Sequence, residues 1–413
     1  MFAMNKKILK KYAELVVKTG VNLQKKETLV ISAPVNAADF VEEIVLSAYK
    51  NGASDVEVLW NDEIVSRYGF RYKTKKQLAI ISEWEKIQRE SFVDKKVTYM
   101  AIISDDPENF KGINPEKIAI YRRAKNAAFS KFRDYTSSNK IRWSLFAYPN
   151  KKWAKKVYPD LSAAEAMKKL WQAIIDTARL SADDPVKAWE EHQNTLQSRC
   201  DKLNGAKIKK LHYKNSIGTD FSIGLPENYL FCGGAEAGVF DGVKFAANIP
   251  TEEVFSSPDR NSANGKLSAS MPLCRNGQII ENFWFEFKDG KIVDYGAEKG
   301  LDNLKSIIET DEGSRYLGEI ALVGYNSPVR KQNTLFYETL FDENASCHFA
   351  IGDSYPNCVI GGADMDENQI KAAGLNVSLE HVDFMVGTKD LSIKAETEDG
   401  KFFDVFIDGD WAI

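Results

Sequence analysis

The sequence has few cysteines, and its five thiols form no Cys-x-x-Cys pair. An odd number of dispersed thiols argues against a disulfide framework or a cysteine-based zinc site and is typical of proteins of a reducing compartment. No apolar run approaches the ~20 residues that span a bilayer. The N-terminal stretch MFAMNKKILKKYAELVV also has no continuous apolar segment of a secretion signal. We therefore expect a cytoplasmic protein that does not enter a membrane.

Standard catalytic signatures are also missing. There is no His-Glu-x-x-His, no Gly-x-Ser-x-Gly, no Walker A loop, and no Gly-x-Gly-x-x-Gly after the first expected strand. The net charge is −4, and the lysine clusters at 5–11 and 150–156 are interleaved with apolar residues at helical spacing, which is typical of solvated helix faces. We expect no nucleic-acid partner, and any chemistry must come from residues dispersed along the chain.

At 413 residues, of which 44% are hydrophobic, the chain is large enough for more than one domain. Its first part alternates amphipathic helices with short apolar runs, which predicts a parallel sheet with helical crossovers. We expect a Rossmann-like α/β domain over residues 1–160. Its strands are expected at 27–34, 54–60, 96–104 and 141–149, and its helices at 6–23, 36–52 and 75–90.

The character of the sequence then changes. Residues 161–205 read as a helical connection, whereas residues 206–413 show β-type alternation and glycine-rich turns. Asp-Gly pairs within 288–291 and 397–402 predict type I′ hairpins. We expect an α+β, β-rich C-terminal domain, and this domain carries the candidate metal site described next.

Two polar residues interrupt an apolar strand pattern at 376–387. Since side chains alternate between the two faces of a strand, His381 and Asp383 share a face with Leu379 and Met385. A buried carboxylate costs several kcal/mol unless it is paired, hydrogen-bonded or bound to a metal. The pair is therefore either a metal-binding pair or a hydrogen-bonded His-Asp pair in a core.

The stretch RYLGEIALVGY at 315–325 poses the same question, because the two-residue period places Glu319 on one face with Leu317, Ala321 and Val323. Burial would again leave a carboxylate among apolar residues. The alternative is an edge strand in which Glu319 faces water or pairs with Arg315.

Two further segments carry candidate ligands. The adjacent acids Glu252 and Glu253 precede a turn-rich loop and could equally be solvated. The stretch ENASCHFAIGDSYPN combines Glu343, His348 and Tyr355, although a lone histidine is more often a hydrogen-bonded structural residue and a tyrosine a packed ring. The remaining histidines, His192 and His212, lie in a charged helix and a lysine-rich strand with no acid cluster around them, and we interpret both as structural.

One or two histidines with several carboxylates suit zinc, cobalt, manganese or magnesium. The excess of carboxylates favours a site for two metal ions over a single structural zinc.

Four segments in this order and spacing resemble the M29 family of metallo-aminopeptidases, the aminopeptidase T, aminopeptidase S and PepS group. They are IPTEEVFSSPDR, YLGEIALV, LFDENASCHFAIGDSY and LEHVDFMVG. The resemblance extends over essentially the whole chain. It implies that a pair of divalent ions (Zn, Co, Mg or Mn) is bound, with Glu319 bridging them and Tyr355 at the site. The ligands that it implies are Glu253, Glu319, Glu343, His348, His381 and Asp383.

The resemblance also implies a cytosolic homodimer that removes N-terminal residues from peptides with a free N-terminus. Two divalent cations can acidify a water molecule and polarise a carbonyl group. Glu252 or Glu343 could then act as the general base and Tyr355 as a hydrogen-bond donor. Two alternatives are a binuclear hydrolase acting on another amide or ester, and a non-enzymatic ligand-binding protein whose acids are structural.

Overall fold

A computed structural model of the chain describes residues 5–275 and 278–413. The chain forms two compact units. The first contains the residues up to Glu191 together with Ala235–Pro250, and the second contains His192–Gly234 and Thr251–Ile413. The segment that we read as a connection, 161–205, contributes one helix to the first unit, and the chain passes into the second unit within the next helix.

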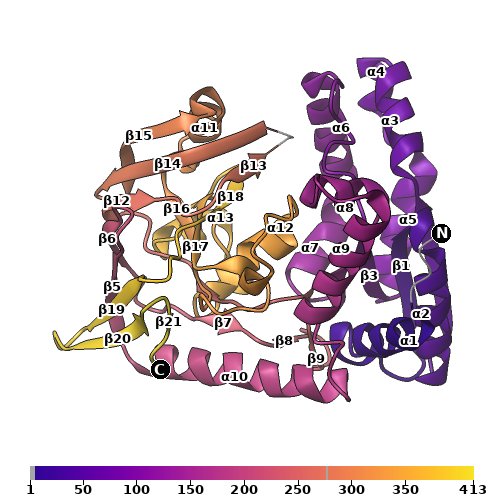
Figure 1. Ribbon diagram of the computed structural model, residues 1–413, viewed down its shortest axis with the longest axis horizontal. Helices are drawn as coiled ribbons and strands as arrows, with labels where there is room; N and C mark the ends of the chain where they lie inside the picture. Colours follow the sequence, from indigo (N-terminus) through magenta and orange to yellow (C-terminus); the bar gives the residue numbers. More distant parts are fainter. Residues whose placement is uncertain (1–4, 276–277) are drawn as a thin grey trace. The chain divides into compact units, whose positions relative to one another are not determined.

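The first unit is built on a parallel sheet of five strands in the order β10-β4-β3-β1-β2, of which β1 and β3 are labelled among the indigo and purple elements of Figure 1. Its strands are β1 (Thr28–Pro34), β2 (Asp55–Asn61), β3 (Thr98–Ile103), β4 (Trp143–Ala147) and the short β10 (Asn248–Ile249). A short two-stranded sheet joins β8 (Glu236–Ala237) to β9 (Lys244–Phe245). The predicted parallel sheet with helical crossovers is confirmed.

The helices of this unit follow the strands in alternation. They are α1 (Lys6–Leu15), η1 (Val16–Gly20), α2 (Ala38–Lys50), α3 (Glu63–Tyr72), α4 (Lys75–Leu78), α5 (Glu83–Asp94), α6 (Pro115–Ala128), α7 (Ser130–Ser137), α8 (Lys151–Val157), α9 (Ala163–Thr177) and the first part of α10 (Pro185–Gly205). The core is aromatic where α1 and α2 meet the sheet. Tyr12 stacks on Phe40 at 4.7 Å, and its hydroxyl donates to the carbonyl of Ala147 at 3.0 Å.

Two details differ from the sequence-based expectation. The helix expected over 75–90 is divided into α4 and α5, because Ser82 forms a capping box with Glu85 and starts a new helix. The fifth strand of the sheet is only two residues long and comes from far along the chain, next to a proline. No hydrophobic period can be read from so short a segment.

The second unit contains two antiparallel sheets. The larger has the order β13-β14-β12-β6-β5-β19-β20-β21, with β15 also paired to β14. Its strands are β5 (Ile208–Lys214), β6 (Asp220–Gly224), β12 (Asn264–Ser268), β13 (Leu273–Arg275), β14 (Gln278–Lys288), β15 (Lys291–Lys299), β19 (Ser392–Thr397), β20 (Phe402–Ile407) and β21 (Asp410–Trp411). Together with the parallel sheet, these sheets confirm a mixed α/β protein.

The smaller antiparallel sheet, called the site sheet below, has the order β18-β17-β16-β11-β7. Its strands are β7 (Cys232–Gly233), β11 (Val254–Ser256), β16 (Leu317–Leu322), β17 (His348–Gly352) and β18 (His381–Met385). The helical segments around it are α11 (Leu301–Ile308), α12 (Thr339–Asp342), η5 (Glu343–Ala345), η6 (Pro356–Cys358) and α13 (Glu367–Ala372).

Both predicted hairpins exist, but only one has the expected turn. Asp289 and Gly290 have φ values of 47° and 85°, as a type I′ turn between β14 and β15 requires. Between β19 and β20 only Gly400 is left-handed, so the type I′ prediction is wrong there. The hairpin has a longer loop, closed by the amide of Thr397 donating to the carbonyl of Lys401. Among the described residues, no helix has the length and apolar character needed to cross a bilayer.

Candidate metal centre

The register of the site sheet places the predicted ligands on one face. Glu319 of β16 lies opposite Ala350 of β17, and Ala350 lies opposite Asp383 of β18. Paired residues of neighbouring strands point to the same face, so the two carboxylates flank a methyl group. Small residues between them leave room for their side chains and for a ligand.

The histidines reach the same face. His348 lies opposite Ala321, and His381 is two residues before Asp383 on β18. Glu253 directly precedes β11, in which Phe255 lies opposite Ala321. The two-residue period therefore directs Glu253 to the side of the sheet that carries Glu319.

The opposite face of the site sheet is apolar and belongs to the core that it shares with the larger sheet. Phe349 packs against Tyr213 of β5 at 5.1 Å, and Phe384 packs against Phe285 of β14 at 5.1 Å. The alternating residues that fill this core from the site sheet are Ile320, Leu322, Phe349, Ile351, Val382 and Phe384. The sheet thus has one apolar face and one acidic face.

A bulge in β16 sets this division. The register shifts between Leu317 and Glu319, and Leu317 lies opposite Ile351 on the apolar face. Our expectation that Leu317 shares a face with Glu319 is therefore wrong. A Cβ atom on Gly318 would lie 2.0 Å from the carbonyl oxygen of Asp353, so only glycine fits at the bulge. Leu379, which we placed beside His381, lies before β18 and is 86% exposed.

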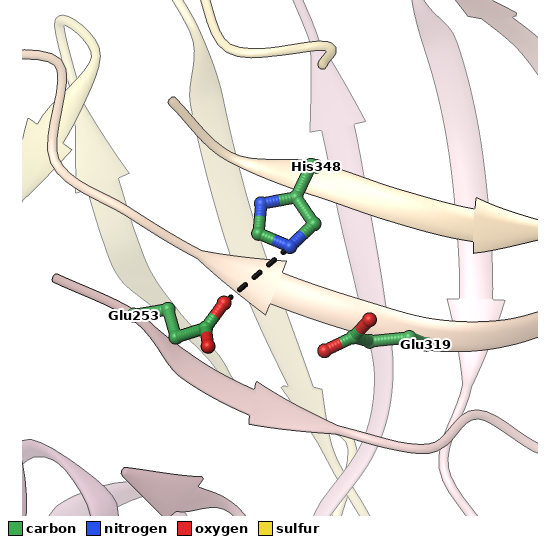
Figure 2. Close-up of side chains that lie close together, drawn as sticks. All are labelled: Glu253, Glu319 and His348. Carbon is green, nitrogen blue, oxygen red and sulfur yellow. Dashed lines mark ion pairs between the residues drawn. The ribbon is translucent and has the colours of Figure 1, made fainter. Parts of the chain in front are cut away.

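Five of the predicted ligands form two overlapping groups. The possible ligand atoms of Glu253, Glu319 and His348 all lie within 4.8 Å of one another, and the same holds for Glu319, His381 and Asp383. Figure 2 shows the first group, in which the carboxylate of Glu253 and the ring of His348 face each other beside Glu319. Nε2 of His348 is 3.4 Å from Oε2 of Glu253. The carboxylate of Glu319 is the element common to both groups.

Both histidines are oriented by backbone carbonyls. Nδ1 of His381 is 2.8 Å from the carbonyl oxygen of Asp353, and Nδ1 of His348 is 3.3 Å from that of Ser346. A carbonyl oxygen can only accept, so each Nδ1 carries the proton and Nε2 points to the acids. An imidazole ring fixed in this way by a second hydrogen bond is typical of metal ligands.

The second group is also an ion-pair cluster. Nε2 of His381 is 3.2 Å from Oε2 of Glu319 and 3.2 Å from Oδ1 of Asp383. Burial alone would lower the pKa of His381, but its hydrogen bonds with Asp383 and Glu319 raise that pKa well above the ordinary value. Burial likewise opposes ionisation of Asp383, yet the hydrogen bond with His381 holds the pKa of Asp383 below its ordinary value.

Glu343 lies in η5, outside both groups but close enough to interact electrostatically with their acids. Burial raises its pKa well above the ordinary value, and the negative charges of Glu253, Asp383 and Glu319 raise it further. An acid with such neighbours holds its proton unless a cation is present. Glu343 therefore interacts with members of both groups.

Tyr355 joins the site by its hydroxyl group. The side chain is 40% exposed, but the hydroxyl lies 3.3 Å from Nε2 of His381. Burial of the hydroxyl and the charges of the nearby acids, Glu319 first among them, raise the pKa of Tyr355 well above its ordinary value. The ring packs edge-on against Phe255 at 5.5 Å. Tyr355 thus remains a proton donor near the acids.

Glu252 turns away from the two groups. Its backbone N–H donates to Oδ1 of Asn344 at 2.7 Å, and its Oε2 lies 3.7 Å from Nε2 of His192. His192 also contacts the carbonyl oxygen of Thr251 at 2.8 Å. His192 thus contacts the acid Glu252, and these contacts hold the segment before Glu253. His212 pairs with Glu396 at 3.0 Å, away from the ligands in sequence and on another sheet.

The alternatives left open by the sequence can now be compared with these positions. Glu319 is 4% exposed on a strand flanked by β17 and β11, so the edge-strand interpretation is wrong. Among the described residues, Glu319 and Asp383 both pair with His381, and no lysine or arginine forms an ion pair with either acid. Oxygen and imidazole donors crowded on one face fit zinc, cobalt, manganese or magnesium.

Several residues that support the ligands were not identified from the sequence. The carbonyls of Asp353 and Ser346 orient the histidines, and Ser257 binds the backbone of Tyr355 in both directions. Asp311 accepts the N–H of Leu379 at 2.6 Å and so holds the segment before β18. Carbonyl groups carry no residue-type signal, although Ser257, Ser346 and Asp353 all lie in segments that carry the resemblance.

Fold and site together define a protein with a parallel α/β unit and a second unit whose antiparallel sheet carries a cluster of acids and histidines that could hold a metal ion. Comparison with known proteins gives the family. The thermophilic metalloprotease family (M29) matches residues 5–411, and the chain belongs to this family.

Its relatives match over nearly their full length. Aminopeptidase AmpS of Bacillus subtilis (strain 168) is 41% identical over 98% of both chains. Aminopeptidase PepS of Streptococcus thermophilus is 40% identical over 99% of this chain and 98% of the relative. The structure of wild-type AmpT from Thermus thermophilus matches with a TM-score of 0.92 at 33% identity and covers 99% of this chain and 100% of that chain. The predicted family and enzyme class, a metallo-aminopeptidase, are confirmed.

Proposed function

We propose that this protein removes the N-terminal residue from peptides with a free N-terminus, and that it uses two divalent metal ions (Zn, Co, Mg or Mn) bound on the acidic face of the site sheet in the second unit. The observation that carries the proposal is the sharing of Glu319 by two three-residue groups of possible ligands. The named activity of the relatives, aminopeptidase, supports the substrate class.

The ligands follow from the two groups. Glu253, Glu319 and His348 would hold one ion, while Glu319, His381 and Asp383 would hold the other. The Glu319 carboxylate would contribute to both. We keep Glu343 as a further member of the set, because its charge interacts with acids of both groups.

When bound, a pair of divalent ions supplies an acidified water molecule and polarises the carbonyl group of the scissile bond. The chain supplies orientation and proton handling. The carbonyls of Ser346 and Asp353 fix the tautomers of the two histidines, so that Nε2 is free to act as a ligand. Glu343 is placed to take up a proton within the cluster, whereas Glu252 is directed toward His192 and leaves this role to Glu343.

Tyr355 would donate a hydrogen bond to the oxygen that gains negative charge during attack. Its hydroxyl lies on the acidic face beside His381, and its raised pKa keeps the proton in place at neutral pH. Donors arranged in advance around such an oxygen typically contribute about 10²–10³ in rate. The phenol is held by the sheet and by Ser257, which is the arrangement that this role needs.

The test combines metal content with a substrate panel. Protein purified without chelator is analysed for bound metals, and its hydrolysis of aminoacyl anilides is compared with that of the same compounds carrying a blocked amino group. We expect two ions per chain, loss of activity with a chelator, and no turnover of blocked substrates. Equal turnover of blocked compounds would indicate a different amide or ester hydrolase, and a metal-free protein unaffected by chelator would indicate a ligand-binding protein.

Location and assembly are proposed from the family alone. We propose a cytoplasmic homodimer, in keeping with the resemblance and with the dispersed thiols of the sequence. Light scattering coupled to gel filtration would test the dimer, since a mass of 46.5 kDa corresponds to the single chain.

A further inference from the structure

Two thiols lie next to each other behind the metal-binding cluster. Cys232 belongs to β7 at the edge of the site sheet, and Cys358 ends η6. The backbone joins the two segments, because the N–H of Leu230 donates to the carbonyl of Cys358 at 2.6 Å. Sγ of Cys232 lies 3.6 Å from the carbonyl oxygen of Asn357. The two cysteines are thus held side by side although 125 residues separate Cys232 from Asn357 along the chain.

The side chains of the pair are in contact. The thiol of Cys358 makes hydrogen bonds with the side chains of Cys232 and Ser257. Cys358 is fully buried, whereas Cys232 is half-buried. A small oxidant arriving from solvent would therefore meet Cys232 first and find Cys358 within reach behind it.

Cys358 is connected to Tyr355 in two ways. Its N–H donates to the carbonyl of Tyr355 at 3.0 Å within η6. Its thiol also contacts Ser257, which binds the backbone of Tyr355. Oγ of Ser257 accepts the N–H of Tyr355 at 2.9 Å and lies 3.3 Å from the carbonyl oxygen of Tyr355. The hydroxyl of Tyr355 in turn lies 3.3 Å from His381. A change at the thiol pair would reach the site through Ser257.

We propose that Cys232 and Cys358 form a thiol modification site, at which a peroxide oxidises the pair to a disulfide and thereby displaces Tyr355 from His381. The formation of the disulfide stands independently of the enzyme's reaction. Its effect on turnover rests on the proposed function.

The chemistry balances with one peroxide. Sγ of Cys232 attacks a peroxide oxygen, the O–O bond breaks, and Cys232 becomes a sulfenic acid with release of water. Sγ of Cys358 then attacks the sulfur of Cys232, an S–S bond forms, and a second water leaves with the proton of the Cys358 thiol. Two thiols lose two electrons and two protons in all, and hydrogen peroxide is reduced to two waters.

The disulfide would remove the thiol that binds Ser257. In the reduced pair the hydroxyl of Ser257 donates to the sulfur of Cys358. The S–S bond draws this sulfur toward Cys232, so Ser257 loses that acceptor and its contacts with the N–H and carbonyl of Tyr355 change. Since the ligands themselves do not move, metal content should stay constant while turnover falls. A thiol reductant would restore both the hydrogen bond and the activity.

The experiment treats the metal-loaded protein with hydrogen peroxide, blocks remaining thiols, and identifies the cross-linked peptide by mass spectrometry. Turnover of an aminoacyl anilide and bound metal are measured before oxidation, after it, and after reduction by a phosphine that does not bind metals as thiols do. We expect a Cys232–Cys358 disulfide, unchanged metal, and a reversible fall in kcat of about tenfold. This is less than the roughly 10²–10⁴ that a positioned proton donor contributes, because Tyr355 is displaced and not removed.

Three variants separate the possible causes. Cys232→Ser changes the half-buried member of the pair. It should keep the activity that the protein has before oxidation but lose the response to peroxide. Cys358→Ala should lose the response as well. Cys274→Ser alters a half-buried thiol in β13 and should respond like the unaltered protein. In Tyr355→Phe the disulfide should form but change the remaining turnover less than about twofold, because the group on which it acts is gone.

Each result decides a part of the proposal. Absence of the Cys232–Cys358 disulfide in the folded protein would overturn the modification site. A disulfide that leaves turnover unchanged, or lowers it equally in Tyr355→Phe, would overturn the connection through Tyr355. Failure of the proposed function would look different, since an inactive protein could still form the disulfide.

Discussion

An inner strand of each five-stranded sheet is largely buried, but the two strands differ in chemistry. In the parallel sheet, β1 buries a continuous apolar run that includes Leu29, Val30 and Ile31. In the site sheet, all six residues of β16 are buried too, but Glu319 is one of them. Burial alone therefore does not distinguish a structural sheet from a functional one. The distinguishing feature is an acid that burial should exclude.

The difference also concerns stability. Burying an apolar side chain of the parallel sheet contributes roughly 1.5–3 kcal/mol. Burying a carboxylate costs several kcal/mol unless something compensates it. On the site sheet His381 compensates Glu319 and Asp383, and the raised pKa of Glu343 shows that this compensation is incomplete for the whole set. We therefore expect the buried acids to lower the stability of the fold while they provide the binding site, as is common at functional sites.

The largest expected effect comes from removing the shared acid. Glu319→Gln keeps the shape of the side chain but takes away the charge that both groups use. We expect loss of bound metal and a fall in kcat/KM of at least about 10³-fold, because neither group retains its third ligand. Without metal, the variant should melt at the same temperature as the unaltered protein or higher, because one negative charge fewer is buried among the acids of the two groups.

Metal analysis, anilide turnover and thermal melts in chelator measure these outcomes. Glu227→Gln, an exposed acid of the same unit, is the matched control and should change none of them. Full occupancy by two ions in Glu319→Gln would contradict the shared role. A lower melting temperature in chelator would contradict the claim that this acid costs stability.

Tyr355→Phe should produce the next largest effect. The phenyl ring can keep its contact with Phe255, so the fold and the metal content should be retained. Without the hydroxyl we expect kcat to fall by about 10–10²-fold with a smaller change in KM, as for a group that acts mainly in the transition state. Turnover close to that of the unaltered protein would remove Tyr355 from the mechanism.

The comparison of the sheets also shows what the sequence could reveal. The apolar runs of the parallel sheet and the acids of the site sheet were both readable, the first by periodicity and the second because an acid among apolar residues is conspicuous. The residues that hold the site in place could not be identified from the sequence. Gly318, the carbonyl of Asp353 and the carboxylate of Asp311 act through backbone geometry, which has no residue pattern, and the two-residue strand β10 is too short for any period.

Gly318→Ala tests the bulge that separates the two faces of β16. A methyl group would have to occupy the space 2.0 Å from the carbonyl of Asp353, the same carbonyl that orients His381. We expect a loss of about 1–3 kcal/mol in the free energy of unfolding, typical of overpacking, together with weaker metal binding. Denaturant unfolding measures the first effect and metal titration the second.

Gly69→Ala is the matched control, because a Cβ atom at this position of α3 meets nothing within 4 Å. It should be neutral or stabilising by up to about 1 kcal/mol, as is usual for alanine in a helix. If Gly318→Ala behaved like Gly69→Ala, the bulge would not be needed to place Glu319 on the acidic face.

The smallest effect is expected at Asp311, which supports the site from a distance. Burial opposes ionisation of this carboxyl, but hydrogen bonds from Leu379, Ser378 and Ser314 lower its pKa below the ordinary 3.8. A lowered pKa in the folded state means that the stabilisation is fully present above the unfolded pKa and is lost as the pH falls through the folded pKa. Asp311→Asn should therefore cost about 1–3 kcal/mol at neutral pH and progressively less in acid.

Unfolding measured from neutral pH to about pH 3 distinguishes this from a general loss of packing. The difference between the variant and the unaltered protein should narrow as the pH falls below about 4, whereas Asp364→Asn, which changes an exposed carboxyl, should follow the unaltered protein throughout. Metal affinity should fall only slightly, because Asp311 holds the segment before β18 and touches neither histidine. A difference from the unaltered protein that stayed constant with pH would show that the Asp311 carboxylate acts through its shape and not through its charge.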